Sequence, residues 1–177
     1  MSLLEKGIIL LDGFELSPDT KLEEFERAFS ESIIKTEMNG ITIYNFGTRV
    51  FNIYEQSFFV RTVQFSKTGR LSHIELTCVK TVPRTAYFSQ QNLEFTEAIA
   101  GDWLQASLGL PQHAESHPDK IMSYDFVWGS LGYYCMFDRH DMCYYGNKIE
   151  IDYRRYSSKV NIDSSTMTAH VFEEVEE

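Results

Sequence analysis

Residues 33–80, IIKTEMNGITIYNFGTRVFNIYEQSFFVRTVQFSKTGRLSHIELTCVK, decide the fold because they consist of β-rich runs joined by very short turns. The runs are IIKTE, GITIYNF, RVFNIYE, SFFVRTVQFS and LSHIELTCVK, and the separators are MNG, GT, EQ and KTG. Alternating polar and apolar residues within the runs are typical of strands with one buried face. Connections this short favour an antiparallel meander over parallel βαβ units. We therefore expect this block to form the sheet.

Helical patterns flank this block on both sides. A short strand is expected over 8–16, and SPDTKLEEFERAF then starts a helix with Thr20 as its predicted N-cap. A second helix is predicted near 90–109, because apolar residues recur there at helical spacing. Gly109 followed by Pro111 is a typical C-terminal stop. The sheet should therefore have one helix before it and one after it.

The chain is predicted to close with a hairpin. SYDFVWGSLGYYCMF, residues 123–137, reads as one long β-run in which Gly129 marks a bulge or a bend, and IEIDYRRY, residues 149–156, reads as the returning strand. The predicted class is α+β: an antiparallel β-meander sheet with an N-terminal helix and a second helix near 90–109. Residues 1–177 are expected to form a single α+β domain, with an acidic C-terminal tail at about 172–177.

The composition of the chain favours some classes of function over others. The 177 residues carry a formal net charge of −10. An excess of acid argues against binding a phosphate backbone and favours a basic partner. The basic segment 61–90 leaves RNA or anion binding open as a minor alternative. No apolar run approaches the roughly 18 residues that span a bilayer, and the start lacks the features of a signal peptide. Three cysteines are too few for a disulfide framework, so a cytoplasmic protein with reduced thiols is expected.

The stretch CMFDRHDMC, residues 135–143, comes closest to a chemical motif. A zinc site would need further ligands, because Cys135 and Cys143 have no partner CxxC elsewhere in the chain. Asp138 and Asp141 do not belong to a calcium loop of the DxDxDG type. The favoured interpretation is the charged tip of a hairpin, with metal binding and catalysis left open as alternatives.

Histidines supply two further candidates. His113 and His117 flank Glu115, but the order differs from the HExxH of zinc proteases and prolines bracket the segment. His73 and Glu75 share one face of a predicted strand, where such a pair could act as a general base and its orienting group. No serine or cysteine stands in a nucleophile elbow, so a polar sheet face is the favoured interpretation. Neither pair predicts a metal site or a catalytic site.

Aromatic residues around the closing hairpin are the strongest candidates for binding. Tyrosine, tryptophan and arginine anchor protein interfaces, because they bury a large area and keep a polar tip. Some of these aromatic residues should complete the core, and the others should contact a partner together with nearby acids. The predicted partner-binding residues are Tyr133, Tyr134, Phe137, Asp138, Asp141, Tyr144, Tyr145, Glu150 and Asp152.

Several segments also match a known pattern. They are IILLDGF followed by SPDTKLEEF, Trp103-Leu104 with Gly109-Leu110-Pro111, and Asp125–Gly129 leading into Asp138-Arg139 and Ile149–Tyr153. In these parts the chain resembles the small acidic immunity proteins of bacterial toxin–immunity systems. The resemblance implies a cytoplasmic, non-enzymatic inhibitor that binds a cognate toxin domain, often a basic nuclease, and blocks its active site or a nearby surface. Independently of the resemblance, we expect the protein to use no cofactor or metal and to bind neither nucleic acid nor a membrane.

Two other function classes stay open at this stage. The first is a small metal-dependent or hydrolytic enzyme that uses His73, Glu75, His140 or the histidines at 113 and 117. The second is a carrier of a small ligand built on a barrel-like sheet, which an apolar pocket would support. The sequence predicts neither the identity of a partner nor the oligomeric state.

Overall fold

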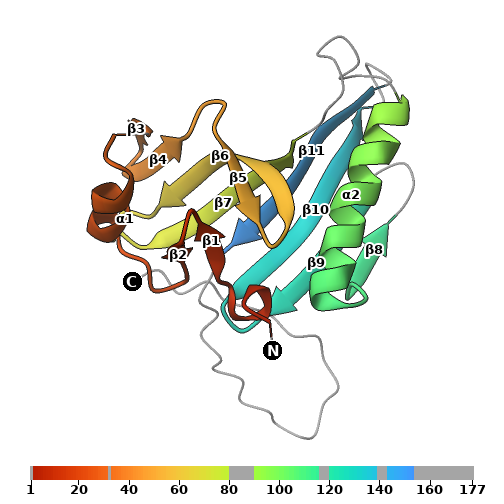
Figure 1. Cartoon of the computed structure of the whole chain (residues 1–177), viewed down its shortest axis with the longest axis horizontal. Helices are drawn as coiled ribbons and strands as arrows, with labels where there is room; N and C mark the ends of the chain where they lie inside the picture. The colour runs from red at the N-terminus through yellow and green to blue at the C-terminus, as the bar shows by residue number, and fades with distance from the viewer. Residues whose placement is uncertain (1, 32, 80–89, 116–119, 139–142, 154–177) are drawn as a thin grey trace, which may run out of the picture.

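The structure is a computed structural model that describes residues 2–31, 33–79, 90–115, 120–138 and 143–153. In this part of the chain the main element is a nine-stranded antiparallel sheet, and one of its faces carries both α-helices and a small β-hairpin (Figure 1). The helical elements are η1 (Leu4–Lys6), α1 (Leu22–Phe29) and α2 (Gln90–Leu108). The strands are β1 (Ile9–Leu11), β2 (Phe14–Leu16), β3 (Ile34–Met38), β4 (Ile41–Asn45), β5 (Val50–Ile53), β6 (Gln56–Phe65), β7 (Leu71–Cys78), β8 (His113–Glu115), β9 (Lys120–Phe126), β10 (Gly129–Asp138) and β11 (Cys143–Asp152).

The sheet consists of two meanders joined side by side. Its strand order is β3-β4-β6-β7-β11-β10-β9-β8, and β5 pairs with β6. Strands β4 and β5 follow one another along the edge of β6 that does not pair with β7. The meanders meet where β7 pairs with β11, with Ile74 opposite Ile151. This pairing brings together two strands that are separated in sequence by α2 and the strands β8–β10.

Alternation along the central strands divides the sheet into a buried face and an open face. On β7 the side chains of Ile74, Leu76 and Cys78 are buried, whereas those of His73 and Glu75 are partly exposed. Strand β11 repeats the pattern, with its isoleucines buried and its charged residues between them partly exposed. The apolar set packs against the helices, and the polar set lines the open face of the sheet.

Aromatic side chains form the core beneath α1. The Phe25 side chain is fully buried, and its ring centroid lies 5.0 Å from those of Phe29 and Tyr44 and 5.2 Å from that of Phe65. Such tilted and edge-on aromatic pairs contribute beyond the apolar area that they bury. Phe25 therefore fixes α1 against β4 and β6.

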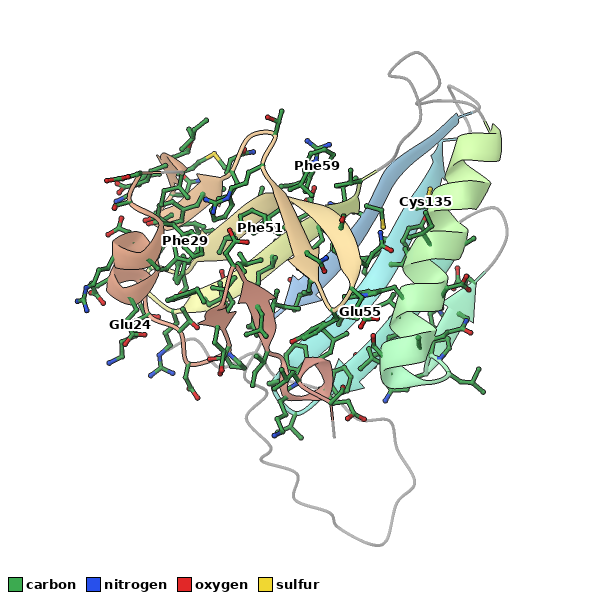
Figure 2. The ribbon with its side chains drawn as sticks, in the orientation of Figure 1. Glu24, Phe29, Phe51, Glu55, Phe59 and Cys135 are labelled. Carbon is green, nitrogen blue, oxygen red and sulfur yellow. The ribbon has the colours of Figure 1, made fainter. Side chains whose placement is uncertain are left out.

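Helix α2 covers the other half of the sheet. Its Ala100, Trp103 and Leu104 side chains are buried, and Gly109, with a φ of 81°, follows its last turn as predicted. Cys135 on β10 lies beside α2 (Figure 2) and is fully buried. Within the described residues, neither helix combines the length and the apolar character that a membrane span requires.

The predicted α+β class is confirmed, because the structure contains an antiparallel sheet and two α-helices in its described part. The order of elements differs, because the first helical element is only the turn η1, and α1 follows the β1–β2 hairpin. Thr20 is not the N-cap of α1, which is Lys21. The Thr20 hydroxyl instead accepts a hydrogen bond from the Ser17 N–H at 2.8 Å and stabilises the preceding turn.

The closing hairpin also differs from its prediction. The run over 123–137 is not one strand, since the chain reverses at Val127 and Trp128 between β9 and β10. Gly129 pairs with Phe126 directly after this turn. A short strand, β8, adds a further edge, so the second half of the sheet is a four-stranded meander in the described part of the chain.

Candidate functional site

The predicted partner-binding hairpin is formed by β10 and β11. At its tip the backbone of Phe137 pairs with that of Tyr144, and Asp138 pairs with Cys143. The side chains of Phe137, Asp138, Tyr144 and Tyr145, and the whole of Asp141, lie outside the described residues. Their role in binding stays a prediction.

The other predicted residues of this hairpin separate between the two faces of the sheet. The Tyr133 side chain is 1% exposed and belongs to the core, so the prediction that it contacts a partner is wrong for this fold. Tyr134 points to the opposite face and is partly exposed. Glu150 and Asp152 lie on the open face, where they face β7. Strict alternation along the strands explains this division.

A charged cluster occupies the open face where β7 meets β11. His73 Nδ1 lies 2.7 Å from Asp152 Oδ1. Glu75 and Glu150 stand directly opposite each other, a like-charge pair that would destabilise the sheet on its own. The Lys148 ammonium lies 3.1 Å from Glu75 Oε2 and 2.5 Å from Glu150 Oε1, and thus bridges the two carboxylates.

The surroundings of Lys148 alter its acidity. Partial burial acts to lower the pKa of Lys148, but hydrogen bonds to Glu150 and Glu75 outweigh it, and the pKa is raised. The ammonium is therefore held in its charged form between the two carboxylates. Lys148 therefore reduces the repulsion between Glu75 and Glu150 across the β7–β11 junction.

The same cluster contains the metal-ligating set found among the described residues. One ligand atom each from His73, Glu75 and Glu150 lies within 4.8 Å of the others. A nitrogen and two carboxylate oxygens are suitable ligands for a divalent transition metal. However, Lys148 already supplies a positive charge to both glutamates, so a metal ion would have to displace its ammonium. The sequence predicted that His73 and Glu75 share one face of a strand, but it did not predict that Glu150 lies beside them.

The remaining predicted metal residues do not assemble into a site in the described structure. His113 Nε2 lies 3.1 Å from Glu115 Oε1 on the exposed strand β8, and His117 and His140 lie outside the described residues. Cys78 and Cys135 are buried on the core face of the sheet. These two cysteines pack in the core as small apolar side chains.

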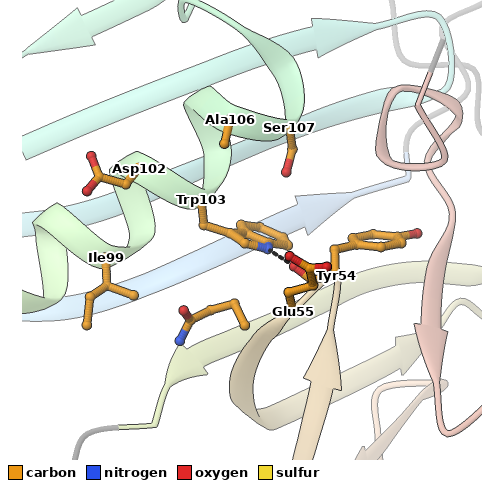
Figure 3. Close-up of a pocket in the computed structure, with 8 residues that line it drawn as sticks. Tyr54, Glu55, Ile99, Asp102, Trp103, Ala106 and Ser107 are labelled. Carbon is orange, nitrogen blue, oxygen red and sulfur yellow. Dashed lines mark hydrogen bonds between the residues drawn. The ribbon is translucent and has the colours of Figure 1, made fainter.

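A groove on the helix-bearing side was not predicted. It has a volume of about 700 Å³ and lies between α2 and the turn that joins β5 to β6 (Figure 3). Figure 2 shows Glu55 at this turn, close to α2. The lining residues are Tyr54, Glu55, Gln56, Ile99, Asp102, Trp103, Ala106 and Ser107.

The turn that forms one wall of the groove has an unusual backbone. Tyr54 and Glu55 have φ values of 47° and 70°, and they connect a pair formed by Ile53 and Gln56. A two-residue hairpin turn of this kind favours asparagine and glycine, because both central residues are left-handed. The left-handed region costs a residue with a side chain of this kind about 1 kcal/mol or more. The sequence predicted a turn at EQ, residues 55–56, one position away from the strained pair.

Three contacts hold this turn in place. The Tyr54 hydroxyl donates a hydrogen bond to the Ile8 carbonyl at 2.6 Å, and the Trp103 indole N–H donates to the Tyr54 carbonyl at 3.3 Å. The Tyr54 and Trp103 rings are nearly parallel, with their centroids 6.5 Å apart. Burial raises the pKa of Tyr54 to about 12, so its phenol remains a donor at neutral pH. Strained backbone held in this way is common at functional sites.

The charge of the groove is negative. Glu55 and Asp102 have no hydrogen-bond or ion-pair partner among the described residues, and no lysine or arginine lines the groove. Helix α2 as a whole contains three acidic residues and no basic one. In contrast to the carboxylates of the open face, those of the groove are available to an external cation.

Comparison of the chain with protein-family models, with curated proteins and with solved structures gives no significant match. The function is therefore inferred from the residues and geometry of this chain alone.

Proposed function

We propose that the protein is a non-enzymatic, acidic inhibitor of the immunity or antitoxin type, which neutralises a cognate basic toxin domain, such as a nuclease, by binding it directly in the cytoplasm. The observation that carries the proposal is the groove between α2 and the β5–β6 turn. Glu55 and Asp102, two carboxylates without a partner among the described residues, stand beside the aromatic pair Tyr54 and Trp103. Carboxylates beside aromatic rings suit the basic side chains of a partner.

The net charge of −10 supports the proposal independently of the groove. Opposite net charges accelerate the association of two proteins and make its rate depend on ionic strength. The resemblance of the sequence to small acidic immunity proteins points in the same direction. A catalytic role has less support, because Lys148 balances the carboxylates around His73 on the open face.

The direct test uses the product of the gene next to that of this protein. The two purified proteins are mixed and examined by size-exclusion chromatography and calorimetry, and the toxic activity is measured with and without the inhibitor. We expect a complex of 1 μM affinity or tighter, in the general range of about −8 kcal/mol or better, with an association rate that falls as salt is added. Failure to form a complex at any salt concentration would exclude this partner.

The assembly of His73, Glu75 and Glu150 supports a second candidate, a metal-dependent enzyme. Metal analysis of the purified protein separates the two functions. One equivalent of zinc, lost on replacing His73 by Ala, would favour the enzyme. A preparation without bound metal that still forms the complex would favour the inhibitor.

A further inference from the structure

We propose that the groove between α2 and the β5–β6 turn is the docking site for an arginine side chain of the basic partner. The inference rests on the proposed function, because it assigns the surface through which the inhibitor would bind. It differs from the sequence prediction, which placed the partner at the β10–β11 hairpin.

The first argument is charge. The groove has a carboxylate on each wall, Glu55 from the turn and Asp102 from α2. On the open face Lys148 contacts Glu75 and Glu150, and His73 contacts Asp152, whereas Glu55 and Asp102 have no partner among the described residues. A guanidinium suits a carboxylate such as Glu55 or Asp102, because its five N–H groups point outward in one plane and two of them can be donated to one carboxylate.

The second argument is the aromatic wall. Trp103 and Tyr54 stack on each other with an angle of 20° between their planes, and both line the groove. The face of a tryptophan or tyrosine ring attracts a cation, and arginine is the most frequent partner in such contacts. Trp103 itself is buried, with 7% of its surface exposed, so the accessible ring is that of Tyr54, which is partly exposed. A flat guanidinium therefore matches the carboxylates and the Tyr54 ring, whereas a metal ion would match the carboxylates alone.

The third argument is the backbone that presents Glu55. At a φ of 70°, this position favours glycine or asparagine over glutamate. The turn is nevertheless held rigidly by the hydrogen bonds of Tyr54 to Ile8 and of Trp103 to Tyr54. A rigid turn presents the carboxylate with little loss of conformational entropy on binding. Glu55 thus occupies an unfavourable backbone conformation, although its carboxylate has no hydrogen-bond or ion-pair partner among the described residues.

The indole N–H groups provide a direct assay. The chain has two tryptophans, Trp103 in the groove and Trp128, whose indole N–H donates to the Glu5 carbonyl at 2.9 Å and which does not line the groove. A proton–nitrogen NMR spectrum therefore shows one reporting signal and one internal control. The probe is a pentapeptide of two arginines and three glycines, and its control is the same peptide with citrulline, which lacks the positive charge.

We expect the arginine peptide to shift the Trp103 signal in a saturable manner, to leave Trp128 unchanged, and to lose its effect in the citrulline form. The double variant Glu55→Gln and Asp102→Asn should bind the peptide about five- to tenfold more weakly, as expected for two contacts between unlike charges. The matched control is Glu31→Gln with Asp125→Asn, which removes the same charge from exposed acids outside the groove. It should bind as the wild type does.

The same variants in the assay with the neighbouring gene product separate this inference from the proposed function. If wild type and double variant bind that protein equally, and the peptide leaves Trp103 unmoved, the groove is not the docking site although the inhibitor function stands. If the peptide moves Trp103 but the gene product does not bind, the cation site stands and the inhibitor function toward that protein fails. If both double variants weakened binding equally, the effect would come from net charge alone, and the inference would be overturned.

Discussion

Replacing Lys148 by methionine tests whether the open-face cluster is a charge-compensated element of the sheet. Methionine keeps most of the aliphatic stem and removes the ammonium that bridges Glu75 and Glu150. The two carboxylates then face each other across β7 and β11 without a cation between them. We expect the variant to fold and to be less stable than the wild type.

The expected loss follows from the geometry. Two ion pairs disappear, each worth about 0.5–1 kcal/mol at a site where the three side chains are 24–28% exposed. The like-charge pair that remains adds about 0.5 kcal/mol of repulsion. Together these terms give a loss of roughly 2 kcal/mol in the free energy of unfolding. For a protein of this size the loss corresponds to a decrease in Tm of about 4–8 °C.

The loss of stability caused by the Lys148 substitution should depend on pH in a definite direction. Because the pKa of Lys148 is raised in the folded state, its contribution is complete below the unfolded pKa of about 10.4 and is lost as the pH rises through the folded value. The difference between wild type and variant should therefore be present at neutral pH and decrease as the pH rises above the unfolded pKa of Lys148.

Urea unfolding of both proteins between about pH 4 and pH 11 measures the difference. Adding Glu150→Gln to the Lys148 variant should restore part of the stability at neutral pH, since it removes the repulsion from Glu75. A loss that stays constant across the pH range, or a double variant that is no more stable than the single one, would refute the electrostatic account.

Three further predictions concern the helix-bearing side of the sheet. Gly7→Ala should destabilise the fold by about 2 kcal/mol or more in thermal unfolding, because a Cβ there would lie 2.7 Å from the Trp128 ring at a φ of 72°. Tyr54→Phe should cost about 1 kcal/mol at neutral pH through the lost bond to Ile8. Since the pKa of Tyr54 is raised to about 12, the wild type should lose stability as the pH rises from about 10 to about 12, and the variant should lose less. Glu55→Gly should raise the free energy of unfolding by up to about 1 kcal/mol, because it relieves a left-handed φ, while it weakens the binding of the arginine peptide.

Local patterns predicted most of the architecture. Short separators between alternating runs identified the strands of the first meander, and helical spacing identified α2 to within a residue. These features depend on contacts between near neighbours in sequence, which a pattern contains. The turn at Val127 and Trp128 was missed because neither residue is a typical turn former, and the apolar run continues through it.

The candidate sites could not be predicted because they depend on long-range pairing. His73 meets Asp152, and Glu75 meets Glu150, only because β11 pairs with β7 rather than with another edge. The groove likewise requires α2 to pack beside the β5–β6 turn, which brings Trp103 to Tyr54. Sequence alternation assigns a residue to a face of its own strand, but it does not identify the neighbouring strand.

The two acidic surfaces differ in a way that bears on where a basic partner would bind. A partner that approached the open face would have to compete with Lys148 for Glu75 and Glu150, so any new ion pair would replace one that already exists. At the groove, Glu55 and Asp102 have no partner in the part of the chain that the structure describes, so a partner's cation would add an ion pair there. Because an ion pair gained is worth more than one exchanged, the groove should contribute more affinity than the open face, although both contribute to long-range attraction. Neutralising Glu55 should therefore increase the dissociation rate of a complex, whereas neutralising Glu150 should affect mainly the stability of the fold.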